Sequence, residues 1–438
     1  MTSVAGRLGL VAPGSKEGWR SVILLCVLFL FSMVDRLVLG LLTVDIGRDL
    51  HATDAQLGLV IGTAFAMVYS IAGLPIAHFL DHGNRKRLIV AGVVLWSLMT
   101  MLSAFAPNIV ALGLCRSGMA LGEAVLTPGA VSLIADLFAR EKRILPTACY
   151  SAMSVITIGG LIIGAAAFQL AQHLAPVFGL SAWRLTLVLT GLPPLLVGLI
   201  FAWIASEPRR GQFDDPVIGD EPPPGMGACW VYLRTNRRFY LPLYFATATI
   251  MIYLFGIMTW APTLMIRAHG VSPAKAGYYF GMLGMVLGVA GATVWPRLAV
   301  VLGRRGHRDP IMTALATGVA FGTPFITIGA ASHSLPLFLA GTGLGLFGCS
   351  TVAALMPVAI QSYGPPRMRA RLASITSFAQ SLIGYGLGPV LIAELAKAWP
   401  QNPMALGYAL SVAGAVAGPL TAILYVVARR SLRDRPLA

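Results

Sequence analysis

The chain has few charged residues. Asp, Glu, Lys and Arg make up 11% of its 438 residues, whereas hydrophobic residues make up 57%. A soluble domain is about 25% charged. This chain cannot cover itself with a polar surface, which excludes an ordinary soluble protein. The composition therefore predicts a protein that lies in a lipid bilayer.

The sequence is also poor in the residues that build catalytic and metal sites. It has five cysteines and seven histidines, and no cysteine pair has the spacing of metal ligands. No triad order, phosphate loop or His/Cys cluster occurs. His78 and His82 lie one helical turn apart and are a weak alternative as metal ligands. A nucleotide-binding loop follows a strand, whereas no strand precedes the glycine-rich run from Gly384 to Pro389. We therefore expect no enzyme, no cofactor and no metal.

Long apolar runs are abundant. A helix that crosses ~30 Å of hydrocarbon needs about 20 residues. No segment alternates polar and apolar residues as a barrel strand does. The sequence thus predicts an all-α membrane protein with twelve transmembrane helices, which begin near Arg20, Gln56, Arg87, Asn108, Arg143, Trp183, Phe239, Pro273, Asp309, Pro336, Met368 and Met404.

The basic residues orient these spans. If both termini are cytoplasmic, most of the 32 Lys and Arg residues fall in the inner segments. This bias follows the positive-inside rule and requires an even number of spans. The net charge of +15 is thereby explained by contact with anionic membrane lipids. We therefore do not expect nucleic acid as a partner.

The longest polar interval, Glu207 to Arg238, contains three consecutive prolines and follows the sixth span. It reads as a linker with a possible surface helix near Cys229 to Leu233. Two six-helix halves are typical of transporters, whose site lies between the halves near the midplane. The predicted organisation is a cytoplasmic tail 1–19, a six-helix bundle 20–206, a cytoplasmic linker 207–238, a second six-helix bundle 239–428 and a cytoplasmic tail 429–438.

Four charged residues interrupt the apolar spans. Asp35 and Arg36 lie in the first span, and Arg116 and Glu123 lie in the fourth. Asp35 and Glu123 each lie about 22 Å from the start of their span. Because the two spans run in opposite directions, we expect both acids near the bilayer centre. Arg116 and Glu123 are two turns apart and share one helix face.

Charged groups inside a membrane are costly and are normally functional. The alternative is an ion-pair network that only locks the two spans together. We expect Asp35 and Glu123 to couple protons, and Arg36, Arg116 and Glu123 to contact substrate. An anionic substrate that takes an arginine from its carboxylate makes that carboxylate easier to protonate. Glu123 is predicted to be the more titratable acid, because its sequence neighbours offer no donor beyond the backbone.

A second set of charges lies at the predicted cytoplasmic ends of the spans. Asp81 and Arg85 follow span two, Asp136 ends span four, and Arg369 begins span eleven. Asp81 could cap span eleven, since a carboxylate is favoured at a helix N-terminus. With Arg85 bridging to Asp136, these residues would form a cytoplasmic gate. Solvated loop charges are the alternative.

These residues carry a family resemblance. The chain resembles the major facilitator superfamily over nearly its whole length, and the loop from Asp81 to Lys86 is similar to the cytoplasmic signature of that superfamily. Ala77 and His82 depart from its usual Gly and Arg. Within the superfamily the chain most resembles the spinster branch. The motifs that carry this resemblance are Asp35-Arg36, Arg116-x-Gly118-x-x-x-Gly122-Glu123-Ala124, Pro128, Asp136-Leu137-Phe138, Trp183-Arg184, Trp260-x-Pro262, His269-Gly270 and Gly384-x-Gly386-x-Gly388-Pro389.

The resemblance implies the major facilitator fold and alternating access, with a lysolipid or sphingoid phosphate as substrate. We thus expect a proton-coupled secondary transporter whose partners are the transported molecule, protons and membrane lipids. A transporter of a small organic anion and a non-transporting membrane sensor are the alternatives. We expect a monomer in a bacterial inner membrane.

Overall fold

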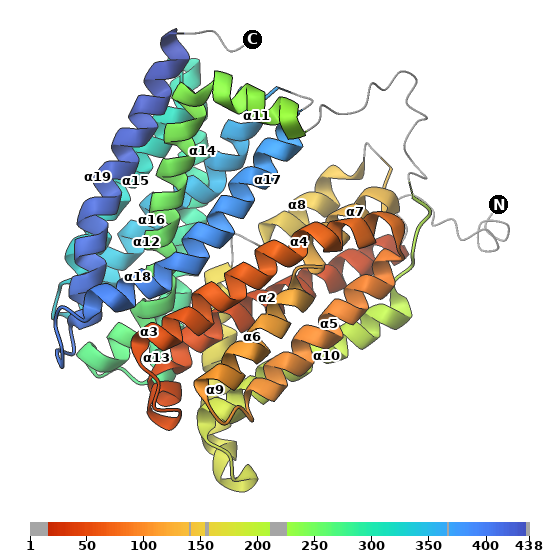
Figure 1. Cartoon of the computed structure of the whole chain (residues 1–438), viewed down its shortest axis with the longest axis vertical. Coiled ribbons are helices and arrows are strands. Elements are labelled where there is room, and N and C mark those ends of the chain that lie inside the picture. Colours follow the sequence, from red (N-terminus) through yellow and green to blue (C-terminus); the bar gives the residue numbers. More distant parts are fainter. Residues whose placement is uncertain (1–15, 140–141, 154–156, 211–225, 366–367, 435–438) are drawn as a thin grey trace. The chain divides into compact units, whose positions relative to one another are not determined.

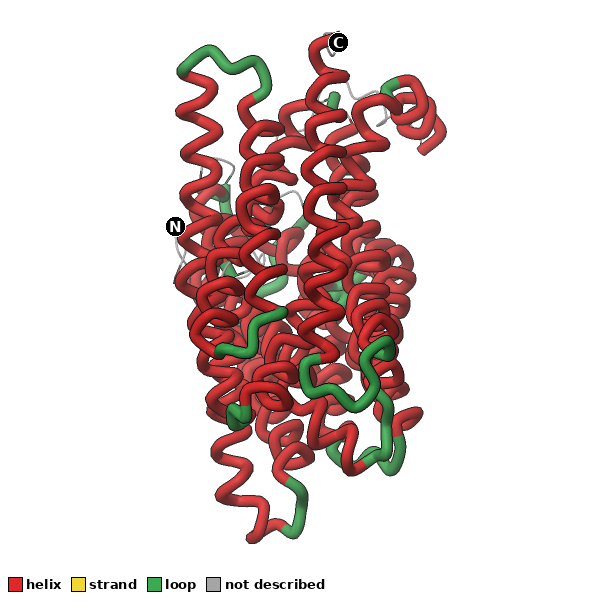
Figure 2. Tube along the Cα trace, turned by 90° about the vertical axis from the view of Figure 1, so that its left-hand side faces the viewer, coloured by secondary structure: helices red, strands yellow, loops and turns green. Residues whose placement is uncertain are grey.

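The computed structural model describes residues 16–139, 142–153, 157–210, 226–365 and 368–434. Within these ranges the chain is helical and contains no strand (Figure 2). Twelve helices are long and apolar enough to cross a membrane, as the sequence predicts. The parts of the predicted tails and linker at 1–15, 211–225 and 435–438 lie outside the described residues.

Two compact units divide the chain by their internal contacts. The first consists of Met1–Ala52 and Ala64–Asp220, and the second of Thr53–Thr63 and Glu221–Ala438. The helices of the first unit are α2 (Lys16–Asp49), α4 (Phe65–His82), α5 (Arg85–Ser103), α6 (Ile109–Glu123), α7 (Leu126–Leu137), α8 (Ile144–Ala152), η3 (Thr157–Gly159), α9 (Gly160–Phe178) and α10 (Ala182–Ile204), drawn from red to yellow-green in Figure 1.

Glycines let the helices of the first unit approach closely. Helix α5 packs against α6 and α10, and α2 packs against α9 and α10. A Cβ atom on Gly122 of α6 would lie 2.5 Å from the carbonyl oxygen of Gly92 on α5. The backbones of α5 and α6 therefore touch one residue before Glu123, which fixes where that carboxyl group lies.

The second unit is also a bundle of packed helices. Its helices are α3 (Asp54–Gly58), η1 (Leu59–Ala64), α11 (Met226–Thr235), α12 (Arg237–His269), α13 (Pro273–Leu283), η4 (Gly284–Gly288), α14 (Val289–Arg304), α15 (Pro310–Ala330), α16 (Leu335–Tyr363), α17 (Arg369–Ala379), η6 (Gln380–Tyr385), α18 (Gly386–Ala396) and α19 (Ala405–Asp434). Helix α15 packs against α16 and α19, and α12 packs against α19.

Span two is divided between the units. Thr53 and Gln56 form a capping box at its start. The π-helix η1 follows, and the segment from Thr53 to Thr63 packs with the second unit, where α3 contacts α18. Asp54 accepts two hydrogen bonds from Arg267, of 2.6 and 2.7 Å, and the Thr63 hydroxyl donates to the carbonyl oxygen of Gly386 over 2.6 Å. Asp54 and Arg267 line a cavity of about 580 Å³.

Two further segments refine the predicted organisation. Span five is predicted to begin near Arg143, and the described helix α8 begins beside it at Ile144; an apolar helix long enough to cross a membrane runs from Thr157 to Phe178, and residues 154–156 lie outside the described residues. The surface helix predicted near Cys229 to Leu233 is confirmed as α11. The Cys229 side chain is buried, whereas Trp230 is exposed.

Candidate functional site

The four charged residues of spans one and four meet in the first unit. The Nε of Arg36 on α2 donates a hydrogen bond of 2.7 Å to Oε2 of Glu123 on α6. The Nη1 of Arg116 donates to the backbone carbonyl oxygen of Asp35 over 2.9 Å, and its Nη2 donates to that of Arg36 over 3.2 Å. The four residues therefore lie at one level of α2 and α6, and their depth in the bilayer stays a prediction.

Glu123 is held by donors from α2. Its side chain is fully buried, and besides Arg36 the hydroxyl of Ser32 donates to Oε2 over 2.8 Å. Side-chain donors therefore reach Glu123 from another helix, although its own sequence neighbours offer none, and the greater titratability of Glu123 stays a prediction. The prediction considered the sequence neighbours of Glu123 on its own helix, whereas the donors come from residues 87 and 91 positions away.

Asp35 has a poorer set of partners than Glu123. It is 1% exposed, and Thr100 of α5 donates to its Oδ2 over 3.3 Å. No residue that the structure describes donates a hydrogen bond to its Oδ1. Arg116 donates to the backbone carbonyl group of Asp35 in the contact given above. Glu123 likewise has one buried oxygen, Oε1, without a donor among the described residues, so the two acids differ in the partners of their other oxygen: a guanidinium and a hydroxyl for Glu123, and a hydroxyl for Asp35.

Accessibility also separates the two arginines. The Arg36 side chain is 21% exposed, whereas Arg116 is 2% exposed. Arg36 is therefore the more accessible guanidinium, whereas Arg116 is buried and donates to the backbone carbonyl groups of Asp35 and Arg36 and to the sulfur of Met119. The predicted substrate contacts of Arg36, Arg116 and Glu123 stay predictions, as does the proton coupling of Asp35 and Glu123.

Two aromatic residues complete the cluster. The Cζ atoms of Arg36 and Arg116 each lie 4.9 Å from the centroid of the Phe65 ring, and Cζ of Arg36 lies 4.7 Å from that of Tyr69. The sequence by itself assigns neither Phe65 nor Tyr69 to the cluster. Their spacing of four residues places both rings on one helix face, but no signal in the sequence directs that face to the arginines.

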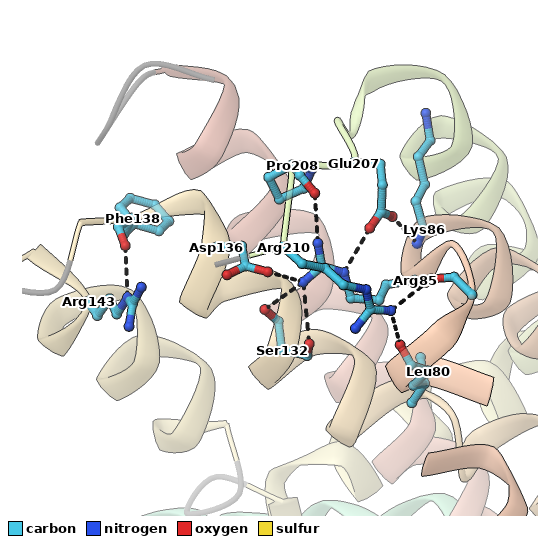
Figure 3. A network of polar contacts seen from close by, with 11 residues as sticks. Leu80, Arg85, Lys86, Ser132, Asp136, Phe138, Arg143, Glu207, Pro208 and Arg210 are labelled. Carbon is cyan, nitrogen blue, oxygen red and sulfur yellow. Dashed lines mark hydrogen bonds and ion pairs between the residues drawn. The ribbon is translucent and has the colours of Figure 1, made fainter. Parts of the chain in front are cut away.

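A second polar network gathers at one end of the first unit (Figure 3). The predicted ion pair between Arg85 and Asp136 is present. Arg85, whose side chain is fully buried, also donates from Nε to Glu207 over 2.7 Å and from Nη2 to the carbonyl oxygen of Pro208 over 2.8 Å. Glu207 further accepts from the backbone N–H of Lys86 over 2.7 Å. Sequence reasoning placed Glu207 in a free linker and missed this role.

The remaining gate candidates have different surroundings. Asp81 is exposed, and so is Arg369, whose Nε donates to the carbonyl oxygen of Gly364 over 3.1 Å at the end of α16. Asp81 and Arg369 belong to different units, so the predicted cap of Asp81 on span eleven stays a prediction. Among the described residues no group of His, Cys, Asp and Glu side chains could hold a metal ion.

Comparison with known proteins places this geometry in a family. The model of the Major Facilitator Superfamily matches residues 24–389. An MFS-type efflux pump of Mycolicibacterium smegmatis is 26% identical over 96% of this chain and 94% of its own length. Protein spinster homolog 1 of Bos taurus is 27% identical over 87% of this chain and 74% of its own. The sphingosine-1-phosphate transporter SPNS2 of Danio rerio is 24% identical over 86% and 77%.

A solved structure agrees with these relatives. A bacterial homolog of the human lysosomal transporter Spinster, in an inward-facing and unoccupied conformation, has a TM-score of 0.82 and 24% identity, covering 96% of this chain and 99% of that chain. This likeness establishes the fold. Twelve apolar helices in this fold make the chain a multi-pass integral membrane protein, and its bacterial relatives fit an inner membrane.

Proposed function

The chain belongs to the Major Facilitator Superfamily, and from this premise we propose that it is a proton-coupled secondary transporter of an amphipathic anion that works by alternating access. The observation that carries the proposal is the hydrogen-bonded ion pair between the partly exposed Arg36 and the buried Glu123. Arg36 is the member of this pair that a solvent-borne anion can reach. Glu123 is the fully buried member, so its carboxylate has no exposed surface to be hydrated when an anion binds Arg36.

The pair couples anion and proton through a shared partner. Removing one member of a buried ion pair leaves an uncompensated charge, which costs several kcal/mol. An anion that binds Arg36 withdraws the guanidinium from Glu123, and the stranded carboxylate then takes up a proton. The charge of the cluster stays unchanged in this exchange, because the anion replaces the carboxylate. By linkage, protonation of Glu123 must strengthen anion binding to the same extent.

Asp35 supplies a second protonation site in this proposal. Its carboxyl group accepts from Thr100 over 3.3 Å, with the second oxygen buried and without a donor among the described residues. A protonated carboxyl group fits such a site because it carries no charge to be solvated. We propose that Asp35 changes protonation during the cycle while Glu123 exchanges between Arg36 and a proton.

The substrate is proposed to be lipid-like, with an anionic head that binds Arg36. The relative from Danio rerio is named a sphingosine-1-phosphate transporter, and the relative from Mycolicibacterium smegmatis is named an efflux pump. Both names are compatible with an amphipathic anion. A small organic anion and a non-transporting sensor, the alternatives from the sequence, differ from this proposal in measurable ways.

The test is proton movement in liposomes that contain the purified protein and an internal pH dye. Sphingosine-1-phosphate is expected to move protons, and benzoate, a small carboxylate, is not. Glu123→Gln should abolish the signal, whereas Glu394→Gln should not, because Glu394 pairs with Lys397 on an exposed surface. A response to benzoate alone would support the organic-anion alternative. No proton movement with either compound would contradict proton-coupled transport and favour the sensor.

A further inference from the structure

Both arginines of the cluster lie against one aromatic ring. The Cζ atoms of Arg36 and Arg116 are each 4.9 Å from the centroid of Phe65, so they are less than twice this distance apart. Phe65 is 2% exposed. Its ring stacks on Tyr69, with centroids 5.5 Å apart and planes 18° apart, and Tyr69 contacts Arg36 in turn. A guanidinium within about 6 Å of a ring centroid is attracted by the ring quadrupole.

The local backbone structure accounts for the positions of the Phe65 and Tyr69 rings. Phe65 is the first residue of α4, directly after the π-helix η1, and Tyr69 lies one turn later. A π-helical turn inserts an extra residue and re-aims the side chains that follow, and such turns are frequent at functional sites. The change from η1 to α4 thereby turns both rings toward the arginines of α2 and α6.

Protonation of the two acids leaves the positive charges of the arginines uncompensated, and the aromatic rings can stabilise these charges. With Asp35 and Glu123 ionised, the charges of the cluster cancel. With both protonated, Arg36 and Arg116 remain charged, since guanidinium does not lose its proton in proteins. Two like charges in a buried site then need compensation from groups that do not titrate with the acids. The face of Phe65 supplies negative electrostatic potential at every pH.

We propose that Phe65, supported by Tyr69, is a positioning residue that holds Arg36 and Arg116 together when the carboxyl groups are protonated. This inference rests on the proposed function and deepens it. Arg36, the more exposed of the two, then presents guanidinium donors to a head group in a site where the buried Arg116 adds a second positive charge. The site therefore suits a head with two charges and several acceptor oxygens, such as a phosphate monoester, better than a carboxylate.

Several titratable or charged side chains surround the two rings and affect the pH dependence of transport. These groups are Asp35 and Arg36 of α2, Arg116 and Glu123 of α6, Tyr69 of α4 and Tyr150 of α8, which interacts with Tyr69 and Arg36. Of these, Asp35 and Glu123 are the groups whose charge the proposed cycle changes. Loss of the Phe65 ring should make the arginines depend more on ionised carboxylates. Protonation of the cluster then requires a lower pH.

The test compares Phe65→Leu with Phe65→Trp and with the control Phe168→Leu, whose ring is equally buried but lies outside the cluster. We expect Phe65→Leu to raise the KM for the phosphate-headed lipid of the transport assay about tenfold. The pH of half-maximal transport should fall by about one unit. Phe65→Trp should retain both values. Replacing Phe65 with phenylalanines of increasing fluorine content should raise KM stepwise, which loss of packing alone would not do.

A stability measurement tests the inference without transport. The loss of melting temperature in Phe65→Leu should be larger at pH 5 than at pH 8, whereas that in Phe168→Leu should be the same at both. An equal loss at both pH values in the two variants would overturn the positioning role, as would a flat fluorine series. If Glu123→Gln leaves proton movement unchanged while Phe65→Leu shows the pH-dependent loss, the proposed function fails and the role of Phe65 survives.

Discussion

Asp35 and Glu123 are both buried carboxyl groups, yet removing their charge should have different consequences. Glu123 accepts hydrogen bonds from Arg36 and Ser32, whereas Asp35 accepts a long hydrogen bond from Thr100. An amide at position 123 strands part of the charge of Arg36. An amide at position 35 can still accept from Thr100, and it brings no charge into the protein interior.

At the residue scale we therefore predict opposite effects on stability. Glu123→Gln should lower the free energy of unfolding by about 2 kcal/mol, because a partly buried ion pair loses one member. Asp35→Asn should be neutral or stabilising. Thermal unfolding of the two variants in the same detergent measures the difference. A larger loss in Asp35→Asn than in Glu123→Gln would show that the assignment of partners is wrong.

At the scale of elements, the crossing of α5 and α6 sets the position of the cluster. A Cβ on Gly122 would lie 2.5 Å from the Gly92 carbonyl oxygen and 2.8 Å from the backbone nitrogen of Trp96. Backbone atoms cannot move aside as the end of a flexible side chain does. A methyl group at this point must therefore push α6 away from α5 and carry Glu123 with it.

Gly122→Ala is predicted to destabilise the protein by about 1–3 kcal/mol, as overpacking of a tight interface does. Proton-coupled transport should fall with it. Gly288→Ala is the matched control, because a Cβ there meets no atom within 4 Å. Melting temperatures and proton flux of both variants test this prediction, which fails if the two glycines tolerate alanine equally well.

The network at Arg85 joins the start of α5, the end of α7 and the segment after α10. Arg85→Gln leaves the carboxylates of Asp136 and Glu207 without their buried cation, so we predict a loss of about 3 kcal/mol. The double variant Arg85→Gln with Asp136→Asn should recover part of this loss, because one stranded charge is removed. Thermal unfolding of the single and double variants gives the coupling, and strictly additive losses would contradict it.

The sequence predicts these elements unevenly. Gln56 and Thr53 signal the start of span two, but no residue pattern marks η1 or the transfer of Thr53–Thr63 to the second unit. Uniformly apolar helices lack the polar face from which periodicity is read. The sequence shows that Arg116 and Glu123 share a face, because both residues lie on one helix. It does not show that Arg36 is the partner of Glu123, because this contact joins two different helices.

At the scale of the whole molecule, prediction from the sequence works because the bilayer restricts the choices. Each crossing needs a long apolar helix with internally satisfied backbone groups, so twelve spans can be counted from hydropathy. The count is confirmed, and so is the fold. The π-helical turns mark a limit, since hydropathy counts a span without showing where its helix departs from regular geometry. Phe65 marks another, because aromatic residues are common in membrane helices and only the tertiary structure brings this one to two arginines.

The central claim for the whole molecule is that an anion and a proton exchange at the pair of Arg36 and Glu123. The most direct measurement is the pH change on adding sphingosine-1-phosphate to the purified protein in weakly buffered detergent solution. Uptake of about one proton per lipid bound is predicted for the natural chain, by linkage between the two ligands. No uptake is predicted for Glu123→Gln. Lipid binding without proton uptake, or equal uptake in both proteins, would contradict the claim.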